Sequence, residues 1–217
     1  LSDLMPKVSR GVMVKHRSYT LSYVEDYEQA EWVAHQLTPY YIEGKAKRRR
    51  NFKYDKKIIS RSASHKDYTN SGYDRGHLLP AADRKRKQQN MNETFLMSNV
   101  APQNQCLNRK GWRILEEKIR RQVRKRDSLF IITGTIITTD SLRIGANEVV
   151  VPQYFYKIIA DHDPNSFCTS AYLVPNACIN KIDKSYLVSI DSLEILSGIN
   201  FFGNLPKEIQ TSFEGSK

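Results

Sequence analysis

Alternating apolar and polar residues mark strands in the first part of the chain. Residues 11–15 and 19–23 both alternate in this way, as strands with one buried face do. The segment 29–37 has the composition of a helix, but its apolar residues do not decide between helix and strand. We therefore expect two early strands, followed by an element whose type the pattern leaves open.

The clearest element is a helix over residues 107–126. Its apolar residues recur at the helical spacing of a buried stripe, formed by Trp112, Leu115, Ile119 and Val123. Lys and Arg residues crowd its C-terminal end, where the helix dipole favours cations. This pattern predicts an amphipathic helix packed against a core.

Two segments before this helix are less regular. Residues 44–72 are polar and basic, and they end in Thr, Asn, Ser and Gly. This composition is typical of a long exposed excursion, and such loops are often functional. Within residues 88–100 we expect a short amphipathic helix that leads into an extended piece at 95–98.

The last part of the chain has the pattern of strands. Residues 129–133 form a short apolar run closed by Gly134, as in a buried central strand, and 149–159 and 170–174 continue the pattern. Strands mixed with segregated helices predict an α+β fold. Because no internal repeat or low-complexity linker is present, we expect residues 1–217 to form one domain.

The net charge of +11 is concentrated in one stretch. Between Lys45 and Arg126, 24 Lys and Arg residues stand against 7 Asp and Glu, a local charge of +17, whereas the remainder carries −6. This distribution indicates a polyphosphate partner, with a solvated surface that favours solubility as the alternative. No apolar run approaches the roughly 20 residues that cross a bilayer, so we expect no membrane partner.

Three cysteines leave the compartment open. They show no CxxC pair and no Cys/His spacing typical of zinc sites. Cys168 and Cys178 could form one disulfide and leave Cys106 free, or all three could be free thiols.

The segment Tyr73–Asp83 carries the most informative chemistry. Hydrolysis of a phosphodiester needs a base for the attacking water and cations for charge on the phosphoryl oxygens. His77 can be the base at neutral pH, and Arg75 can hold a phosphate oxygen. Gly76 would let the backbone aim both side chains at one point. We interpret the other histidines as structural or surface residues: His16, His35, His65 and His162.

A second cluster of candidates lies on the long helix. Magnesium prefers oxygen ligands and keeps several waters, so the amide oxygen of Asn108 is a candidate ligand, with helix capping as the alternative. Glu116 and Arg120 have the spacing of an ordinary ion pair. Eight residues separate Asn108 from Glu116, roughly 12 Å along an unbroken helix. Glu116 is therefore expected to act through a water on the ion or by orienting a neighbour, unless the helix is interrupted.

Three motifs occur in an order that resembles a known family. Asp74–His77 is followed by Leu-Leu-Pro-Ala-Ala, then by Ser98–Gln103 and by Leu107–Glu116. Together they resemble the DNA/RNA non-specific endonucleases, which have a ββα-metal (His-Me finger) active site. The resemblance also covers residues 32–37, where it favours a strand, and 190–206 near the C-terminal end.

The resemblance implies a fold and roles for individual residues. The fold would be a central, mainly antiparallel sheet flanked by helices, with His77 on the first of two paired strands and Asn108 on the helix. His77 would be the general base, and Asn108 the sole direct protein ligand of one Mg²⁺ ion, for which Mn²⁺ can substitute. The expected catalytic residues are His77, Arg75, Glu116 and Asn99, with Arg120, Gln103, Asp74 and Arg84 as supporting or phosphate-contacting residues.

The implied reaction is hydrolysis of DNA and RNA with little sequence preference. His77 would activate water for in-line attack, and the ion on Asn108 would stabilise the charge that develops on phosphorus and the departing 3′ oxygen. Products would carry 5′-phosphate and 3′-hydroxyl ends. The basic loop Lys45–Lys57 and the run Arg84–Lys87 would add contacts to the nucleic-acid backbone. Such contacts carry no base information and predict steep inhibition by salt.

Two other hypotheses concern the same site. A nucleic-acid-binding protein with a dead site is disfavoured because His77, Asn108 and Glu116 are all present. A phosphodiesterase with a narrower substrate is not excluded by any sequence feature. Besides DNA and RNA, the expected partners are a second copy in a homodimer and a protein inhibitor. We favour a secreted or periplasmic bacterial protein, with a mitochondrial protein as the alternative.

Overall fold

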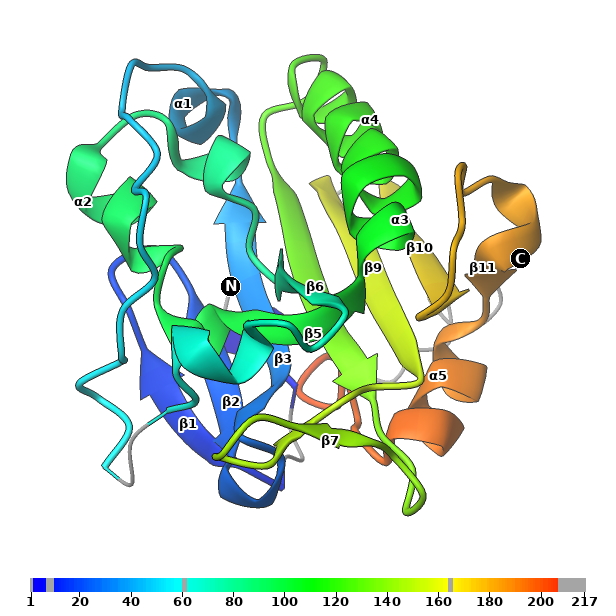
Figure 1. The fold of residues 1–217 in the computed structure, drawn as a ribbon. Coiled ribbons are helices and arrows are strands. Elements are labelled where there is room, and N and C mark those ends of the chain that lie inside the picture. Colours follow the sequence, from blue (N-terminus) through cyan, green and yellow to red (C-terminus); the bar gives the residue numbers. More distant parts are fainter. Residues whose placement is uncertain (1, 7–9, 60–61, 164–165, 207–217) are drawn as a thin grey trace.

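A seven-stranded antiparallel sheet forms the centre of the molecule (Figure 1). The computed structural model describes residues 2–6, 10–59, 62–163 and 166–206, with no description of the side chains of residues 162–168. The strands follow one another across the sheet in the order β1 (Val12–Lys15), β2 (Thr20–Val24), β3 (Gln29–Leu37), β6 (Leu129–Ile136), β9 (Tyr154–Asp163), β10 (Ser166–Pro175) and β11 (Leu187–Val188).

The segment whose type the sequence left open is strand β3. It pairs with β2 on one side and with β6 on the other, and all but one of its residues are buried. A strand covered on both faces does not alternate between apolar and polar residues, which explains why periodicity alone did not identify it. The strand that the family resemblance favoured here is therefore confirmed.

Each central strand sends alternate side chains to opposite faces of the sheet. On β3, Val33 packs into one core cluster and Trp32 into the other; on β6, Ile131 and Ile132 divide in the same way. Helix α5 (Ile190–Ser197) belongs to the second cluster, together with the aromatic residues that follow it. The sheet is thus the middle layer of three.

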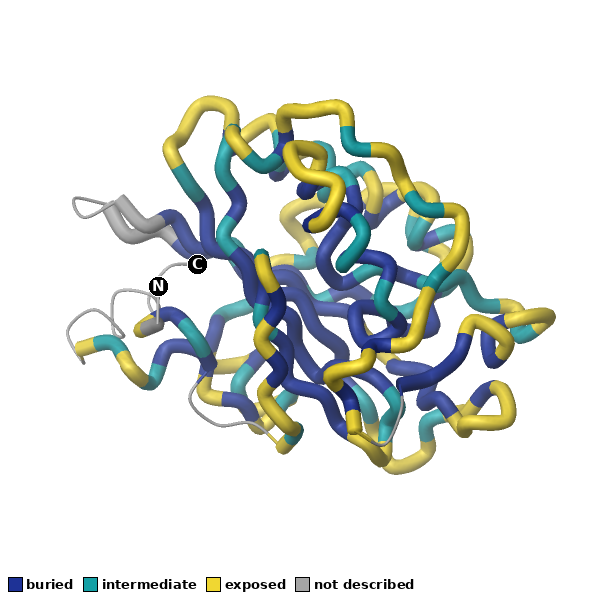
Figure 2. The backbone as a smooth tube through the Cα atoms, turned by 90° about the vertical axis from the view of Figure 1, so that its left-hand side faces the viewer, coloured by how far each residue is buried: buried dark blue, intermediate teal, exposed yellow. Residues whose placement is uncertain are grey.

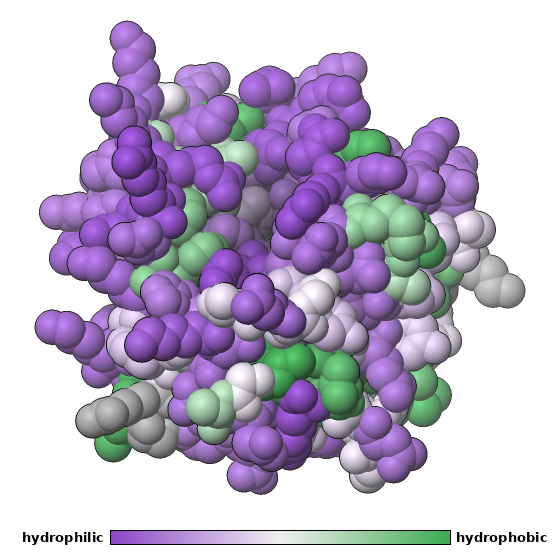
Figure 3. Space-filling model, in the orientation of Figure 1, coloured by the Kyte–Doolittle hydropathy of each residue, from purple (hydrophilic) through white to green (hydrophobic). Residues whose placement is uncertain are grey.

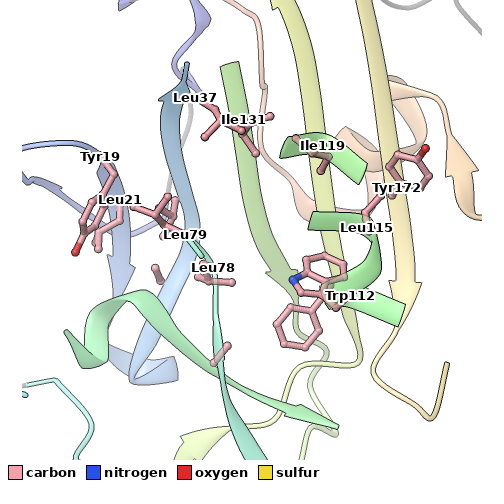
Figure 4. Packing of buried hydrophobic residues seen from close by; sticks show 14 of the residues in the cluster. Tyr19, Leu21, Leu37, Leu78, Leu79, Trp112, Leu115, Ile119, Ile131 and Tyr172 are labelled. Atoms are coloured by element: carbon pink, nitrogen blue, oxygen red, sulfur yellow. The ribbon is translucent and has the colours of Figure 1, made fainter. Parts of the chain in front are cut away.

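The first face is covered by the long helix that the sequence predicted. Helix α4 (Arg113–Val123) continues from α3 (Gln105–Leu107) through a π-helical segment, Asn108–Trp112. Figure 4 shows Trp112 and Leu115 of this helix on its sheet side. The predicted helix is confirmed, and its interruption by a wider turn is new.

Two short paired strands lead into this helix. Strand β4 (Tyr73–His77) pairs antiparallel with β5 (Val100–Asn104), with His77 opposite Val100. The chain then enters α3 directly, so β4, β5 and the helix form a ββα unit (Figure 1). The α+β fold with an antiparallel sheet and a ββα unit is therefore confirmed.

The remaining described elements are short. They are helices α1 (Pro39–Ile42) and α2 (Gln88–Glu93), the β7–β8 hairpin (Arg143–Ile144 and Val149–Val150), and the 3₁₀ turns Ser2–Leu4, Glu25–Tyr27, His65–Tyr68, Ala81–Arg84, Met97–Asn99 and Lys184–Tyr186. Figure 2 shows that buried residues concentrate in the sheet and that much of the connecting chain is exposed. No helix within the described ranges is long and apolar enough to cross a bilayer.

Three local expectations need correction. The extended piece expected at 95–98 is instead a turn followed by a 3₁₀ segment, because the carboxamide of Asn99 bonds back to the carbonyl of Thr94. The strand expected over 149–159 is split between β8 and β9, and Pro152, which cannot donate to a ladder, lies between them.

The third correction concerns the disulfide. Cys178 is bonded to Cys106, with their Cα atoms 4.8 Å apart, so both alternatives left open, a pair with Cys168 and three free thiols, are wrong. Strand β10 runs on from Cys168 to Pro175, which carries the chain roughly 23 Å away before it turns. A disulfide spans at most about 7 Å between Cα atoms, so Cys178 pairs with the cysteine of helix α3.

Candidate active site

A cavity of about 530 Å³ opens where the ββα unit meets the basic loop before it. Figure 3 shows a hollow in a largely hydrophilic face of the molecule. Five arginines, three carboxylates and one histidine line the cavity, together with Phe52 and Asn108: Arg48, Arg75, Arg109, Arg113, Arg120, Asp74, Glu116, Glu117 and His77. The excess of arginine over carboxylate gives this cavity the chemistry that suits an anion.

His77 is the last residue of β4 and lies in the cavity wall. Its ring packs against Phe52 and Phe95, with centroid distances of 5.2 and 5.1 Å. Its Nε2 atom is buried, and no described residue provides a hydrogen-bond partner for it. Burial, with a further contribution from the positive charge of Arg48, lowers the pKa of His77 to about 3. The imidazole is therefore neutral at pH 7, with a nitrogen available to take a proton.

Asn108 is not the cap of the helix. That role belongs to Asn104, whose Oδ1 accepts from the backbone N–H groups of Cys106 (3.0 Å) and Leu107 (3.2 Å). Asn108 has helical backbone angles, and its Nδ2 donates to Asp74 Oδ2 at 2.9 Å. This bond fixes the carboxamide and leaves its oxygen as a neutral donor for a hard cation. Among the described residues, no cluster of His, Cys, Asp or Glu side chains provides another site of this kind.

Asp74 organises the mouth of the cavity. Besides Asn108, it accepts two bonds from Arg109, from Nη2 at 2.7 Å and from Nε at 2.8 Å. Because its carboxylate is committed to these partners, Asp74 acts by holding Asn108. Its neighbour Arg75 donates to the carbonyl of His65 at 2.7 Å and lies over the ring of Phe52.

Gly76 is required for close packing. A Cβ atom there would lie 2.5 Å from both Cβ and Oε1 of Gln103, and the backbone of Gly76 is not left-handed. Arg75 and His77 both line the cavity, as expected, but the glycine between them is required because the close approach of Gln103 excludes any side chain. Gln103 itself is fully buried and lies outside the cavity wall.

The π-helical segment places Asn108 and Glu116 on the same cavity. Eight residues of regular α-helix turn through about 800°, roughly 80° more than two full turns. The extra residue in a π turn rotates all later side chains back about the helix axis by about 100°. It therefore removes most of the roughly 80° angle between Asn108 and Glu116. Both residues consequently line one cavity, although they stay two turns apart along the axis.

Glu116 and Arg120 have different partners. Arg120 Nη1 donates to Asp83 Oδ1 at 2.8 Å, whereas its distance to Glu116 Oε2 is 4.0 Å. The pKa of Glu116 is raised to about 7, mainly by burial; Lys157 and Arg120 oppose the increase, and Asp83 adds to it. The simple ion pair that the spacing indicated is thus secondary to the bond between Arg120 and Asp83.

A layer of buried polar residues adjoins the cavity, and sequence reasoning did not assign it a role. We call Lys157, His35 and Asp83 the polar layer. Lys157 on β9 is 1% exposed and donates to Thr133 Oγ1 at 2.5 Å. His35 Nε2 lies 3.7 Å from Asp83 Oδ2. A lysine inside the apolar run of a central strand was the signal that could have revealed this layer.

Arg84 does not reach the cavity. It is completely buried and donates to three backbone carbonyls, those of Asp83, Ser18 and Gln36, at 2.7–3.1 Å. Its guanidinium lies 4.5 Å from the ring centre of Tyr41. The expected phosphate contact by Arg84 is therefore wrong, because its guanidinium is enclosed inside the protein.

Asn99 is also fully enclosed. Its Oδ1 accepts from Leu79 N at 2.8 Å, and its Nδ2 donates to the carbonyls of Leu79 (3.0 Å) and Thr94 (2.9 Å). These bonds fix the segment that follows His77. Asn99 is absent from the cavity wall and positions other residues, in contrast to the catalytic role that we expected.

The fold and the cavity have counterparts in known proteins. A sequence model of the DNA/RNA non-specific endonuclease family matches residues 4–208. The mitochondrial nuclease EXOG of Danio rerio is 35% identical over 210 residues, and the match covers 89% of this chain but only 61% of that protein. A nuclease of Nostoc sp. is 36% identical over 215 residues, which are 94% of this chain and 77% of that one.

Two further comparisons concern endonuclease G. The human mitochondrial endonuclease G is 34% identical over 203 residues, covering 87% of this chain and 68% of that protein. A crystal structure of the EndoG/EndoGI complex superposes with a TM-score of 0.83 at 32% identity, covering 92% of this chain and 89% of that one. These relatives are nucleases, and the chain belongs to the DNA/RNA non-specific endonuclease family.

Proposed function

We propose that this chain is a magnesium-dependent endonuclease that hydrolyses phosphodiester bonds of DNA and RNA without sequence preference. The observation that carries the proposal is the position of His77, a neutral histidine with an unpartnered Nε2 among the described residues, in a cavity lined by five arginines. The arginines can bind the non-bridging oxygens of a phosphate, and the imidazole can take the proton of an attacking water.

In the proposed reaction, His77 accepts a proton from water as the water oxygen bonds to phosphorus. The bond from phosphorus to the 3′ oxygen breaks, and the departing oxygen takes a proton from solvent water. One fragment then carries a 5′-phosphate and the other a 3′-hydroxyl. Arg75 and Arg48, which both line the cavity, would neutralise charge on the phosphoryl oxygens. Arg120 is held by Asp83 and can contribute in the same way.

The donor set fits one hard cation at Asn108. Asp74 holds the carboxamide through its nitrogen, and Asp74 is itself bonded to Arg109, so the amide oxygen of Asn108 is the available ligand. A bound Mg²⁺, or Mn²⁺ in its place, would supply Lewis-acid stabilisation of charge on the phosphate and on the leaving oxygen. Glu116 lies two turns further along the helix and would act by orienting a neighbour.

The comparisons and the disulfide also support proposals for the partners and the location of this protein. Because EndoG has been solved with EndoGI, we include a protein inhibitor among the proposed partners, and a homodimer stays a prediction. The bond between Cys106 and Cys178 is typical of oxidising compartments, so a secreted or periplasmic location is proposed. The mitochondrial relatives make a mitochondrial location the alternative.

The proposal is tested by incubating plasmid DNA and a structured RNA with the protein at low salt, with magnesium and then with EDTA. We expect internal cleavage of both polymers with magnesium and none with EDTA. If neither polymer is cut with metal present, the enzyme assignment is wrong. Sequencing of the fragment ends checks the expected 5′-phosphates.

A further inference from the structure

A second pocket, of about 560 Å³, lies on the other side of Phe52 from the catalytic cavity. Its lining differs from that of the cavity: the aromatic rings of Phe52 and Tyr54 and the side chain of Met97 supply an apolar surface. Lys53, Lys56 and Lys66 line the same pocket and add positive charge to it. We call this the aromatic pocket.

An exposed aromatic side chain on such a basic surface indicates a nucleotide as the ligand. Tyr54 is 54% exposed although it lies in the most basic part of the chain. Nucleobases have apolar faces that stack on aromatic rings, and their phosphates are bound by cations. A pocket lined by both aromatic side chains and lysines therefore fits a nucleotide better than it fits a bare phosphate or an apolar ligand.

The neighbouring basic groove provides a contrast. It is lined by residues of the same loop and of α2, mostly Lys and Arg such as Arg49 and Arg50, and it contains no aromatic residue. That groove suits the nucleic-acid backbone, which needs only cations. Within the basic loop, the aromatic residues are thus concentrated at the side that faces the aromatic pocket.

The aromatic pocket adjoins the catalytic cavity. Phe52 lines both, and its ring centre is 5.2 Å from that of His77. Arg75 lines the cavity and donates to the carbonyl of His65, which lines the pocket, at 2.7 Å. A nucleotide with its phosphate in the cavity could therefore place an adjacent base in the aromatic pocket.

The pocket is held in shape by buried hydrogen bonds. Asp55 Oδ2 accepts from Ser98 Oγ at 2.6 Å and lies 2.8 Å from His16 Nε2. The backbone of Lys53 bonds to both Phe95 and Met97, at 3.0 and 2.9 Å. These contacts anchor the loop on both sides of Tyr54, so the pocket exists before a ligand binds.

We propose that the aromatic pocket binds one unstacked nucleobase of a single-stranded segment, next to the phosphate in the catalytic cavity. The proposal rests on the proposed function, because it assigns the neighbouring cavity to a phosphodiester. A base in a continuous duplex stays stacked and cannot enter. The pocket would therefore favour single-stranded, frayed or looped nucleic acid over a continuous duplex.

The test measures binding of a short single-stranded DNA in EDTA, where no cleavage is expected. Tyr54→Ala should weaken this binding about 5- to 100-fold, since stacking of one base contributes that much, and should leave duplex binding within about twofold. Tyr54→Phe should bind as the wild type does, because it keeps the ring. Tyr40→Ala is the matched control, as it removes another exposed tyrosine, outside both pockets.

A second measurement replaces one base at a time by an abasic site. With the wild type, one position should lose affinity, and with Tyr54→Ala the same position should lose none. Equal binding of single strands by Tyr54→Ala and wild type, or no abasic position that matters, overturns the proposal. Because cleavage is not measured, this result is independent of whether the protein cuts DNA with magnesium.

Discussion

The arginine-lined cavity and the polar layer next to it each contain a histidine with a lowered pKa. Burial lowers the pKa of His77 to about 3 and that of His35 to about 4, so both rings are neutral at pH 7. They differ in access: His77 lines the cavity, whereas His35 is 2% exposed and faces Asp83 inside the protein. A lowered pKa alone therefore does not distinguish the two histidines, but a place in the wall of an arginine-lined cavity does.

Two arginines of the basic stretch repeat this contrast. Arg48 lines the cavity and can meet a phosphate, while Arg84 is enclosed and donates to backbone carbonyls. Substitutions on the cavity side should change activity with little effect on stability, and substitutions in the enclosed region should do the reverse. The predictions below test this division.

The largest effect is expected from removal of the metal or of its proposed ligand. EDTA should abolish cleavage. Asn108→Ala should reduce the cleavage rate about 100-fold or more, or should raise the magnesium concentration required for cleavage by a similar factor. Asn104→Ala is the control, because it removes the helix cap and should cost only about 1 kcal/mol of stability. Magnesium titrations of cleavage rates measure both variants, and an unchanged metal dependence in Asn108→Ala would remove it from the site.

The next effect separates the two arginines. Arg84→Met should lower the free energy of unfolding by about 3 kcal/mol, because buried carbonyls lose their donors. Arg48→Met should leave stability nearly unchanged, raise KM and reduce the dependence of DNA binding on salt. Urea denaturation and salt titrations make the measurements; a destabilised Arg48→Met would contradict the division.

A smaller effect concerns the stability of the polar layer against pH. The pKa of His35 is lowered on folding, so the unfolded chain binds the extra proton between pH 6.5 and about 4. Stability from this residue is therefore present above pH 6.5 and declines as pH falls, by at most about 1.4 kcal/mol per unit. Comparison of the wild type with His35→Gln isolates this contribution. The difference between their free energies of unfolding should shrink as the pH falls from 6.5 to about 4. A constant difference would contradict a lowered pKa for His35.

The smallest effect is expected at Lys157. Its charge opposes the increase in the pKa of Glu116, so Lys157→Met should raise that pKa above about 7. If ionised Glu116 is required, the acid limb of the rate profile should move to higher pH, with the plateau rate little changed. Thr133→Val removes only the hydroxyl that Lys157 bonds and serves as the control. An unmoved acid limb would mean that Lys157 has no part in positioning charge at the site.

Local motifs made part of this molecule predictable from sequence. The apolar stripe of the long helix identified that helix, and the segment containing His77 identified the cavity, because both depend on residues close together in the chain. Strand β3 was ambiguous because each of its faces packs against a different cluster, which removes alternation.

The remaining features depend on distant partners. Nothing near Arg84 in sequence shows that its guanidinium bonds Ser18 and Gln36. The correct partner of Cys178 is 72 residues away. The helix start was placed near Asn108 when Asn104 is the cap, since two asparagines four residues apart are both suitable as caps. For Arg84 and Cys178 the partners are tertiary contacts, which sequence spacing does not encode.

The central claim is that His77 takes the proton from the attacking water. The most direct test is the single-turnover cleavage rate of His77→Ala on saturating DNA with magnesium, with and without added imidazole, beside DNA binding in EDTA. We predict a rate about 10²- to 10⁴-fold below the wild type, partial recovery with imidazole, and nearly unchanged binding. A rate within a few-fold of the wild type, or a loss of binding as large as the loss of rate, would contradict the claim.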